Sequence, residues 1–171
     1  MFLSIFDIFK LSVGPSSSHT MGPMLAAGRF LDLVARTPLS DGPLAMGCRL
    51  YGSLAYTGEG HGTIRAVLCG LLGMTPESYD REAASMALDE LAKSGTIRLP
   101  NGRVVALDPA TSVYLEKGKR LPAHPNGMTF FVNAGESEIL AESYYSIGGG
   151  FVLTEAEMAA GPAKPQAEDV P

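Results

Sequence analysis

The chain of 171 residues has few cysteines and no excess of basic residues. Its two cysteines, Cys48 and Cys69, are too few to hold by themselves an iron–sulfur cluster or a four-thiolate zinc site. Both lie in apolar surroundings, so we expect buried free thiols rather than a disulfide. With 13 basic and 18 acidic residues and a net charge of −5, the chain lacks the basic surface that binds nucleic acid or an anionic membrane.

Long apolar runs and several well-known motifs are absent too. No apolar run reaches the ~20 residues that cross a bilayer. Residues 1–7 contain an acidic residue within an apolar run and have no basic leader, so we expect a cytoplasmic protein rather than a secreted one. There is no Walker loop, nucleophile elbow or two-histidine zinc helix, and the glycines at 58–62 lack the third glycine of a dinucleotide fingerprint. We therefore predict no metal site in this chain.

The apolar fraction of 46% is enough for one folded domain. Apolar residues at three- and four-residue spacing predict helices over residues 23–34, 64–72 and 80–93, and residues 2–11 show similar spacing. Dense or alternating apolar runs predict strands over residues 44–51, 96–99, 103–107, 111–115, 128–133 and 137–145. Turns at 100–102 and 134–136 predict two hairpins. The pattern favours an α+β fold with a mixed, mostly antiparallel sheet and helices packed on one face.

The composition changes near the C-terminus. Gly148, Gly149 and Gly150 end the last predicted strand, and Ala, Pro, Glu, Lys and Gln dominate from Thr154 onward. We therefore expect a domain over residues 1–153 and a linker over residues 154–171. A linker of this kind is typical of a chain that continues into another domain.

Three serines and a histidine lie in one short stretch, Gly14-Pro15-Ser16-Ser17-Ser18-His19-Thr20, just before the first clear helix. Hydroxyls and exposed backbone N–H groups donate hydrogen bonds to anions, and the start of a helix adds the positive end of its dipole. The stretch is therefore a candidate site for a small carboxylate. The alternative is a solvated loop whose Ser or Thr only caps the helix.

Two of the three histidines, His19 and His61, lie in Ser- or Gly-rich loops that precede helices. If these helices pack side by side, both imidazoles face one pocket and can supply a general base and an acid or carboxylate ligand. A structural imidazole bonded to a backbone carbonyl is the alternative for each. We expect a structural role for His124 in its Pro–Gly turn, and a capping role for Thr63.

These motifs, with others around them, resemble one known family. They are Ser4-Ile5-Phe6-Asp7-Ile8-Phe9-Lys10, the serine stretch with Gly22-Pro23-Met24, Gly60-His61-Gly62-Thr63, His124-Pro125-Asn126-Gly127-Met128 and Tyr144-Tyr145-Ser146-Ile147-Gly148-Gly149-Gly150-Phe151. Their order over residues 4–151 resembles the β-chain-like N-terminal domain of the bacterial iron–sulfur L-serine dehydratases. That domain is itself similar to a substrate-binding regulatory domain of some 3-phosphoglycerate dehydrogenases, which agrees with an α+β fold.

The resemblance implies a lyase that converts L-serine to pyruvate and ammonia with a [4Fe–4S] cluster and without pyridoxal phosphate. The cluster ligands in this family are cysteines of a second, α-chain-like domain, and Cys48 and Cys69 match no cluster motif. The resemblance therefore implies a cluster ligated outside this chain, an α-type partner domain or subunit, and a homodimer for the complete enzyme. This chain by itself is then expected to be inactive.

The resemblance also gives roles to the candidate residues. Ser16, Ser17, Ser18 and Thr20 would bind the substrate, and His61 and His19 would act as base and as carboxylate ligand, with their roles exchangeable. Two other hypotheses remain: a regulatory module that holds serine as an effector in the same loops, and a docking subunit whose loops bind nothing.

Overall fold

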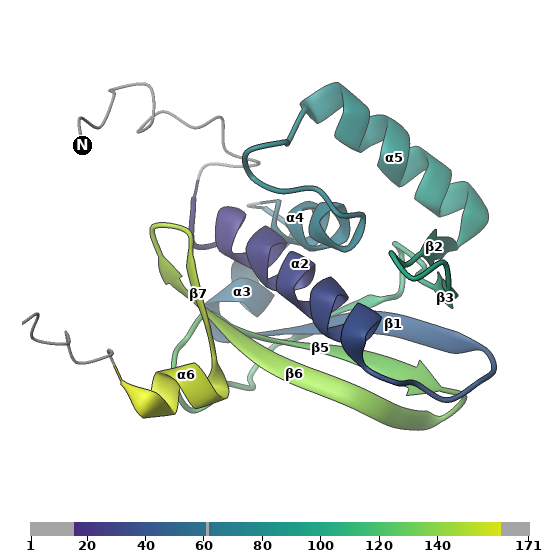
Figure 1. The fold of residues 1–171 in the computed structure, drawn as a ribbon. Helices are drawn as coiled ribbons and strands as arrows, with labels where there is room; N and C mark the ends of the chain where they lie inside the picture. Colours follow the sequence, from purple (N-terminus) through teal and green to yellow (C-terminus); the bar gives the residue numbers. More distant parts are fainter. Residues whose placement is uncertain (1–15, 61, 162–171) are drawn as a thin grey trace, which may run out of the picture.

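The computed structural model describes residues 16–60 and 62–161, in which a mixed sheet is covered by helices (Figure 1). The helices are α2 (Met21–Arg36), α3 (Gly52–Thr57), α4 (Thr63–Leu71), α5 (Arg81–Ser94) and α6 (Glu155–Ala160). The strands are β1 (Leu44–Tyr51), β2 (Thr96–Arg98), β3 (Val104–Ala106), β4 (Val113–Glu116), β5 (Gly127–Ala134), β6 (Ser137–Gly148) and β7 (Phe151–Thr154). The predicted helical segment at residues 2–11 lies outside the described residues.

The sheet has the order β2-β3-β1-β5-β6-β7, and β4 also pairs with β1. Strand β1 runs parallel to β3 and β4 and antiparallel to β5, whereas the β2–β3, β5–β6 and β6–β7 pairs are antiparallel. The α+β class and the mixed, mostly antiparallel sheet are therefore confirmed. Both predicted hairpins form, because glycines at 102 and 135 adopt the positive φ that their turns require.

Helices α2 and α4 lie over one face of the sheet, with α5 beyond α4, and bury the core there (Figure 1). On β1 the alternate residues Met46, Cys48 and Leu50 are buried, as the two-residue period of a strand requires. Phe30 of α2 stacks on Phe130 of β5, with ring centroids 5.5 Å apart. The opposite face is more polar, and there Arg49 forms an ion pair with Glu138.

Helix α4 packs closely against α2 because Gly70 has no side chain. A Cβ at Gly70 would overlap the carbonyl oxygen of Met24 and lie 2.6 Å from the Cβ of Ala27. This close approach places both helices on the same side of the sheet. Helix α5 begins at an Asp80 cap, whose carboxylate accepts from the N–H of Ala83, and ends at Gly95 with φ of 63°.

Three elements were not predicted, and one capping prediction was wrong. Short α3 follows β1 directly, and β7 forms because residues 148–150 make a hairpin turn rather than an end to the sheet. Residues 155–160 of the expected linker form α6, which begins at a capping box made by Thr154 and Glu157. Thr63 does not cap α4: Gly62 is the N-cap, and Thr63 is buried without a hydrogen-bond partner for its hydroxyl among the described residues.

Candidate functional site

His19 lies at the centre of a cluster of hydroxyl groups just before α2. Its Nδ1 is 3.1 Å from Ser16 Oγ and 2.9 Å from Ser18 Oγ. Its Nε2 is 2.9 Å from Oγ of Ser53, which lies 34 positions further along the chain in the first turn of α3. The two serines of the loop are themselves 3.2 Å apart. Both imidazole nitrogens thus contact hydroxyl groups. We call Ser16, Ser18, His19 and Ser53 the serine–histidine cluster.

The remaining two predicted residues of the loop hold its backbone. The hydroxyl of Thr20 donates to the carbonyl of Ser16 at 2.7 Å, and Thr20 is fully buried. The carbonyl of Ser17 accepts from the N–H of Gly22 at 3.0 Å. The Thr20 bond closes a turn that brings Ser16 back toward His19. The side chain of Ser17 is half-buried. Unlike those of Ser16 and Ser18, its hydroxyl makes no hydrogen bond within the described residues.

The fourth member of the cluster, Ser53, is positioned by the chain turn that follows β1. Gly52 has φ of 53°, and a Cβ there would overlap the carbonyl oxygen of Pro125. This close approach lets the N–H of Ser53 donate to the same carbonyl at 3.0 Å. A residue with a side chain at position 52 would be strained and would push the 124–127 loop away. The buried end of β1 therefore connects the cluster to that loop.

The 124–127 loop is connected in turn to β6 and to the start of α2. The backbone N–H of Ser146 donates to the backbone carbonyl of Asn126 at 3.0 Å. The side-chain amide of Asn126 donates to the backbone carbonyl of Ser146 at 3.2 Å. A Cβ on Gly22 would overlap Oγ of Ser146, so β6 packs directly against the first turn of α2. His124 Nδ1 accepts from the N–H of Asn126 at 3.1 Å, the structural role that its turn predicts.

The cluster can change its hydrogen-bonding capacity with the protonation state of His19. A neutral imidazole has one donor and one acceptor nitrogen, so at least one neighbouring hydroxyl must donate to it. In the imidazolium form both nitrogens donate, the serine oxygens accept, and their hydroxyl hydrogens are free to point elsewhere. A positive charge with up to three hydroxyl donors is suited to a carboxylate.

The structure brings together only part of the predicted site. Ser16, Ser18 and His19 meet, and Ser17 and Thr20 shape the loop. His61 lies outside the described residues, so its proximity to His19 stays a prediction. Sequence reasoning missed Ser53, although it follows the end of a buried strand with parallel neighbours, a common position for binding residues.

Two tyrosines of the motif at 144–151 are unsuited to acid–base work at neutral pH. Burial raises the pKa of Tyr144 to about 12, and burial also raises the pKa of Tyr145. Both phenols therefore stay neutral and are not bases near pH 7. They are part of the motif at 144–151, and Tyr144 packs edge-on against Phe130, so we assign it to the core.

The described residues do not fit a [4Fe–4S] cluster. Cys48 lies in the main core under the helices, whereas Cys69 lies in a separate small cluster with Met24, Ala66 and Ala84. Burial raises the pKa of both thiols, which disfavours the thiolates that iron requires. No group of three or more His, Cys, Asp or Glu side chains within residues 16–60 and 62–161 is arranged to hold a metal ion.

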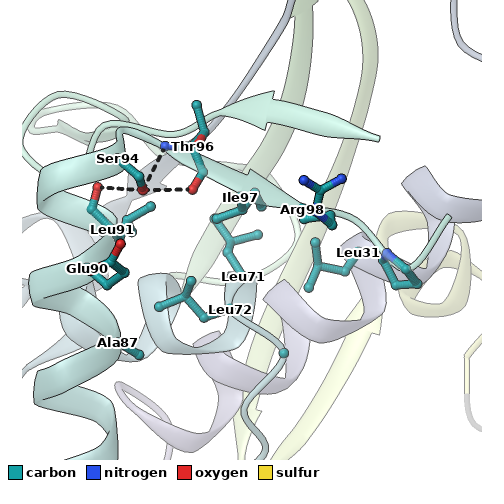
Figure 2. Close-up of a pocket in the computed structure, with 12 residues that line it drawn as sticks. Leu31, Leu71, Leu72, Ala87, Glu90, Leu91, Ser94, Thr96, Ile97 and Arg98 are labelled. Atoms are coloured by element: carbon teal, nitrogen blue, oxygen red, sulfur yellow. Dashed lines mark hydrogen bonds between the residues drawn. The ribbon is translucent and has the colours of Figure 1, made fainter. Parts of the chain in front are cut away.

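An apolar groove lies apart from the serine–histidine cluster. It has a volume of about 430 Å³, and Figure 2 shows Leu31, Leu71, Leu72 and Ile97 lining it beside α5. None of the predicted site residues lines this groove. In the described part of the chain, no helix has the length and apolarity needed to cross a membrane.

Comparison with known proteins identifies the family. Residues 4–157 match the family model of the serine dehydratase beta chain. The chain is 46% identical over 158 residues to an L-serine dehydratase of Mycobacterium tuberculosis and 43% identical over 156 residues to one of Streptomyces coelicolor, each alignment covering 91% of this chain. It is 39% identical over 154 residues, 90% of its length, to L-serine dehydratase 2 of Escherichia coli.

The aligned region is only 34% of the length of each of these relatives, so the chain spans about a third of the proteins that it matches. The order of motifs along residues 4–151, the α+β fold and the family match agree. The chain therefore belongs to the serine dehydratase beta chain family.

Proposed function

We propose that this chain is the part of an L-serine dehydratase that binds the substrate carboxylate and moves its α-proton, in a site completed by another domain. The observation that supports this most is the serine–histidine cluster, where His19 joins hydroxyls from two separate segments. Relatives at 35–46% identity are named L-serine dehydratase, which gives the substrate and the reaction of this proposal.

In this proposal the imidazolium of His19 and the hydroxyls around it bind the carboxylate of L-serine. The Cα proton of an amino acid is weakly acidic while the carboxylate is unneutralised, so donors to the carboxylate ease its removal. The loop is well suited to this role because Thr20 and Gly22 fix its backbone before any ligand binds. Ser16, Ser17 and Ser18 are the proposed donors, and Thr20 holds the loop.

His61 is the proposed general base for the Cα proton. Its loop follows α3, the helix that carries Ser53, and α3 is only six residues long, about 9 Å at 1.5 Å per residue. The chain that leaves α3 therefore starts close to the cluster. Loss of the α-proton and of the hydroxyl group gives aminoacrylate and water, and aminoacrylate then tautomerises and hydrolyses to pyruvate and ammonia.

The proposal includes parts that this chain does not supply. A [4Fe–4S] cluster bound by cysteines of an α-type domain or subunit would assist departure of the serine hydroxyl, without pyridoxal phosphate. The complete enzyme would be a cytoplasmic homodimer, and this chain alone would be inactive. We also propose that the fold is similar to the regulatory domain of 3-phosphoglycerate dehydrogenases.

A regulatory serine-binding module is the second candidate function. One observation favours it: both nitrogens of His19 already contact hydroxyls, an arrangement suited to holding a ligand rather than to accepting a proton from one. In that case L-serine would bind as an effector and the chemistry would take place entirely elsewhere.

Substitution of His61 in a complete enzyme separates the two functions. His61→Ala should lower kcat by roughly 100-fold or more if the imidazole is the base, with the absorbance of the iron–sulfur cluster unchanged. A regulatory role predicts retained kcat with an altered dependence on serine concentration. His124→Ala shows separately what loss of structure does, because the His124 ring holds the turn that Ser53 packs against. A kcat near that of the wild type in His61→Ala would exclude the catalytic role.

A further inference from the structure

A polar cavity lies between α4 and α5, and no residue of the serine–histidine cluster lines it. It has a volume of about 360 Å³ and is lined by Arg65, Tyr79, Arg81 and Ser85. All four side chains carry hydrogen-bond donors, and two of them carry a positive charge at any physiological pH. The family match and the proposed function assign no role to this cavity.

Arg65 is held in a fixed orientation by neutral oxygens. Its Nε donates to the hydroxyl of Tyr79 at 3.2 Å. One terminal nitrogen donates to Oγ of Ser85 at 2.9 Å and to the carbonyl of Arg81 at 3.2 Å. The guanidinium is thus oriented before a ligand binds, while its charge is not neutralised by any of these three partners.

Several donors at the cavity have no acceptor within residues 16–60 and 62–161. The second terminal nitrogen of Arg65 makes no hydrogen bond there, and neither does the guanidinium of Arg81. The Tyr79 hydroxyl accepts from Arg65, so its own hydrogen is free to donate. Ser85 already donates to the carbonyl of Arg81 at 3.0 Å, and its role is to hold Arg65.

The two arginines of this cavity have no carboxylate partner within the described residues. Arg29 and Arg49 form ion pairs with Glu157 and Glu138, whereas the described residues place no carboxylate within 4.0 Å of the nitrogens of Arg65 or Arg81. The neighbouring carboxylate of Asp80 is used as the cap of α5.

We propose that the cavity of Arg65, Tyr79 and Arg81 binds a phosphate group, either inorganic phosphate or the phosphate of a small metabolite. A phosphate dianion matches two guanidinium groups in charge and offers oxygens to the free N–H groups of both, with the Tyr79 hydroxyl as a further donor. A carboxylate carries only one negative charge and fits this donor set less well.

Titration of this chain with sodium phosphate tests the proposal, at constant ionic strength and with amide chemical shifts as the readout. We expect saturable one-site binding, with the largest shifts near residues 65 and 79–85. Arg81→Gln should weaken binding about 10-fold or more, because it removes one charge-assisted hydrogen-bond donor. The variant should still fold, since the Arg81 side chain makes no hydrogen bond within the described residues. Arg65→Gln should weaken binding further, with its fold checked by circular dichroism.

Arg120→Gln is the matched control, since Arg120 is an exposed arginine outside the cavity and the charge change is identical. We expect it to change the affinity less than about twofold, because an exposed distant charge is screened by solvent and salt. A parallel titration with glycerol 3-phosphate distinguishes the two sources of phosphate. Tighter binding than that of inorganic phosphate indicates a site for a phosphorylated metabolite, and weaker binding indicates a site for free phosphate. Absence of saturation, equal weakening by Arg81→Gln and Arg120→Gln, or acetate binding as tight as phosphate would overturn the proposal. None of these outcomes depends on dehydratase activity.

Discussion

Substitution of Gly22 by alanine should destabilise the protein by forcing α2 away from β6. A Cβ at position 22 would overlap Oγ of Ser146 and lie 2.7 Å from the Cβ of Ser146, well inside van der Waals contact. Added methyl groups in well-packed sites cost about 1–3 kcal/mol of unfolding free energy. Alanine recovers up to about 1 kcal/mol of helix propensity over glycine, less near a helix end. The net expectation is a loss of about 1–2 kcal/mol.

Gly28 offers a control within the same helix. A Cβ at Gly28 meets no heavy atom within 4 Å, so Gly28→Ala gains helix propensity without a clash. We expect it to stabilise the protein by about 0.5–1 kcal/mol. Urea unfolding of both variants, followed by circular dichroism, should therefore shift the midpoint in opposite directions. The melting temperature should fall by about 3–6 °C for Gly22→Ala.

A double substitution tests whether the contact with Ser146 is the cause. Ser146→Gly removes both side-chain atoms that the new methyl group would overlap, so Gly22→Ala should cost much less in that background than in the wild type. If Gly22→Ala instead matches Gly28→Ala in stability, or if Ser146→Gly does not reduce its cost, the packing of α2 against β6 is not as described.

The remaining predictions concern the thiols, the α6 ion pair and the core. Burial raises the pKa of both cysteine thiols, so Ellman's reagent should not label the native protein at pH 8 but should label two thiols after denaturation. Hydrogen bonds from Arg29 lower the pKa of Glu157 in the folded protein. The ionised Glu157 therefore stabilises the fold fully above the unfolded-state pKa of about 4.3. This stabilisation is lost as the pH falls through the lower pKa of the folded state. In urea titrations, Glu157→Gln should lower the unfolding free energy by a few tenths of a kcal/mol at pH 7, because the Arg29–Glu157 pair is exposed. The loss should vanish near pH 2. An equal loss at pH 7 and pH 2 would contradict this prediction. Phe130→Ala should cost about 3–5 kcal/mol, since Phe130 is fully buried between Phe30 and Tyr144, and a loss below about 1 kcal/mol would contradict its central place in the core.

The long elements could be predicted from the sequence because their apolar pattern is strong. Strand β1 has the predicted bounds, and the helices at 21–36 and 81–94 contain or nearly match the predicted ranges. Helix α3 could not be predicted because six residues after a strand give too short a pattern to show a helical period. Helix α6 has no buried residue, and its capping box at Thr154 and Glu157 was the only signal available.

The candidate site was predictable in its loop but not in its partners. The serine stretch shows that His19 has hydroxyls beside it, because these residues are neighbours in sequence. Ser53 could not be found in this way, since it reaches His19 only through the turn at Gly52 and the packing of that turn on Pro125. Contacts of this kind depend on the tertiary fold, and they cannot be predicted from the pattern of a single sequence.

The role of the serine–histidine cluster can be measured most directly through kcat/KM for L-serine in a complete enzyme that carries Ser53→Ala. Loss of this hydroxyl removes the partner 2.9 Å from Nε2 of His19, and Ser143→Ala is the control because its hydroxyl bonds only Thr129 in the sheet within the described residues. The account predicts a fall of roughly 10-fold or more in kcat/KM for Ser53→Ala, with cluster absorbance and stability retained, and almost none for Ser143→Ala. Equal kcat/KM values for the wild type and Ser53→Ala would contradict it.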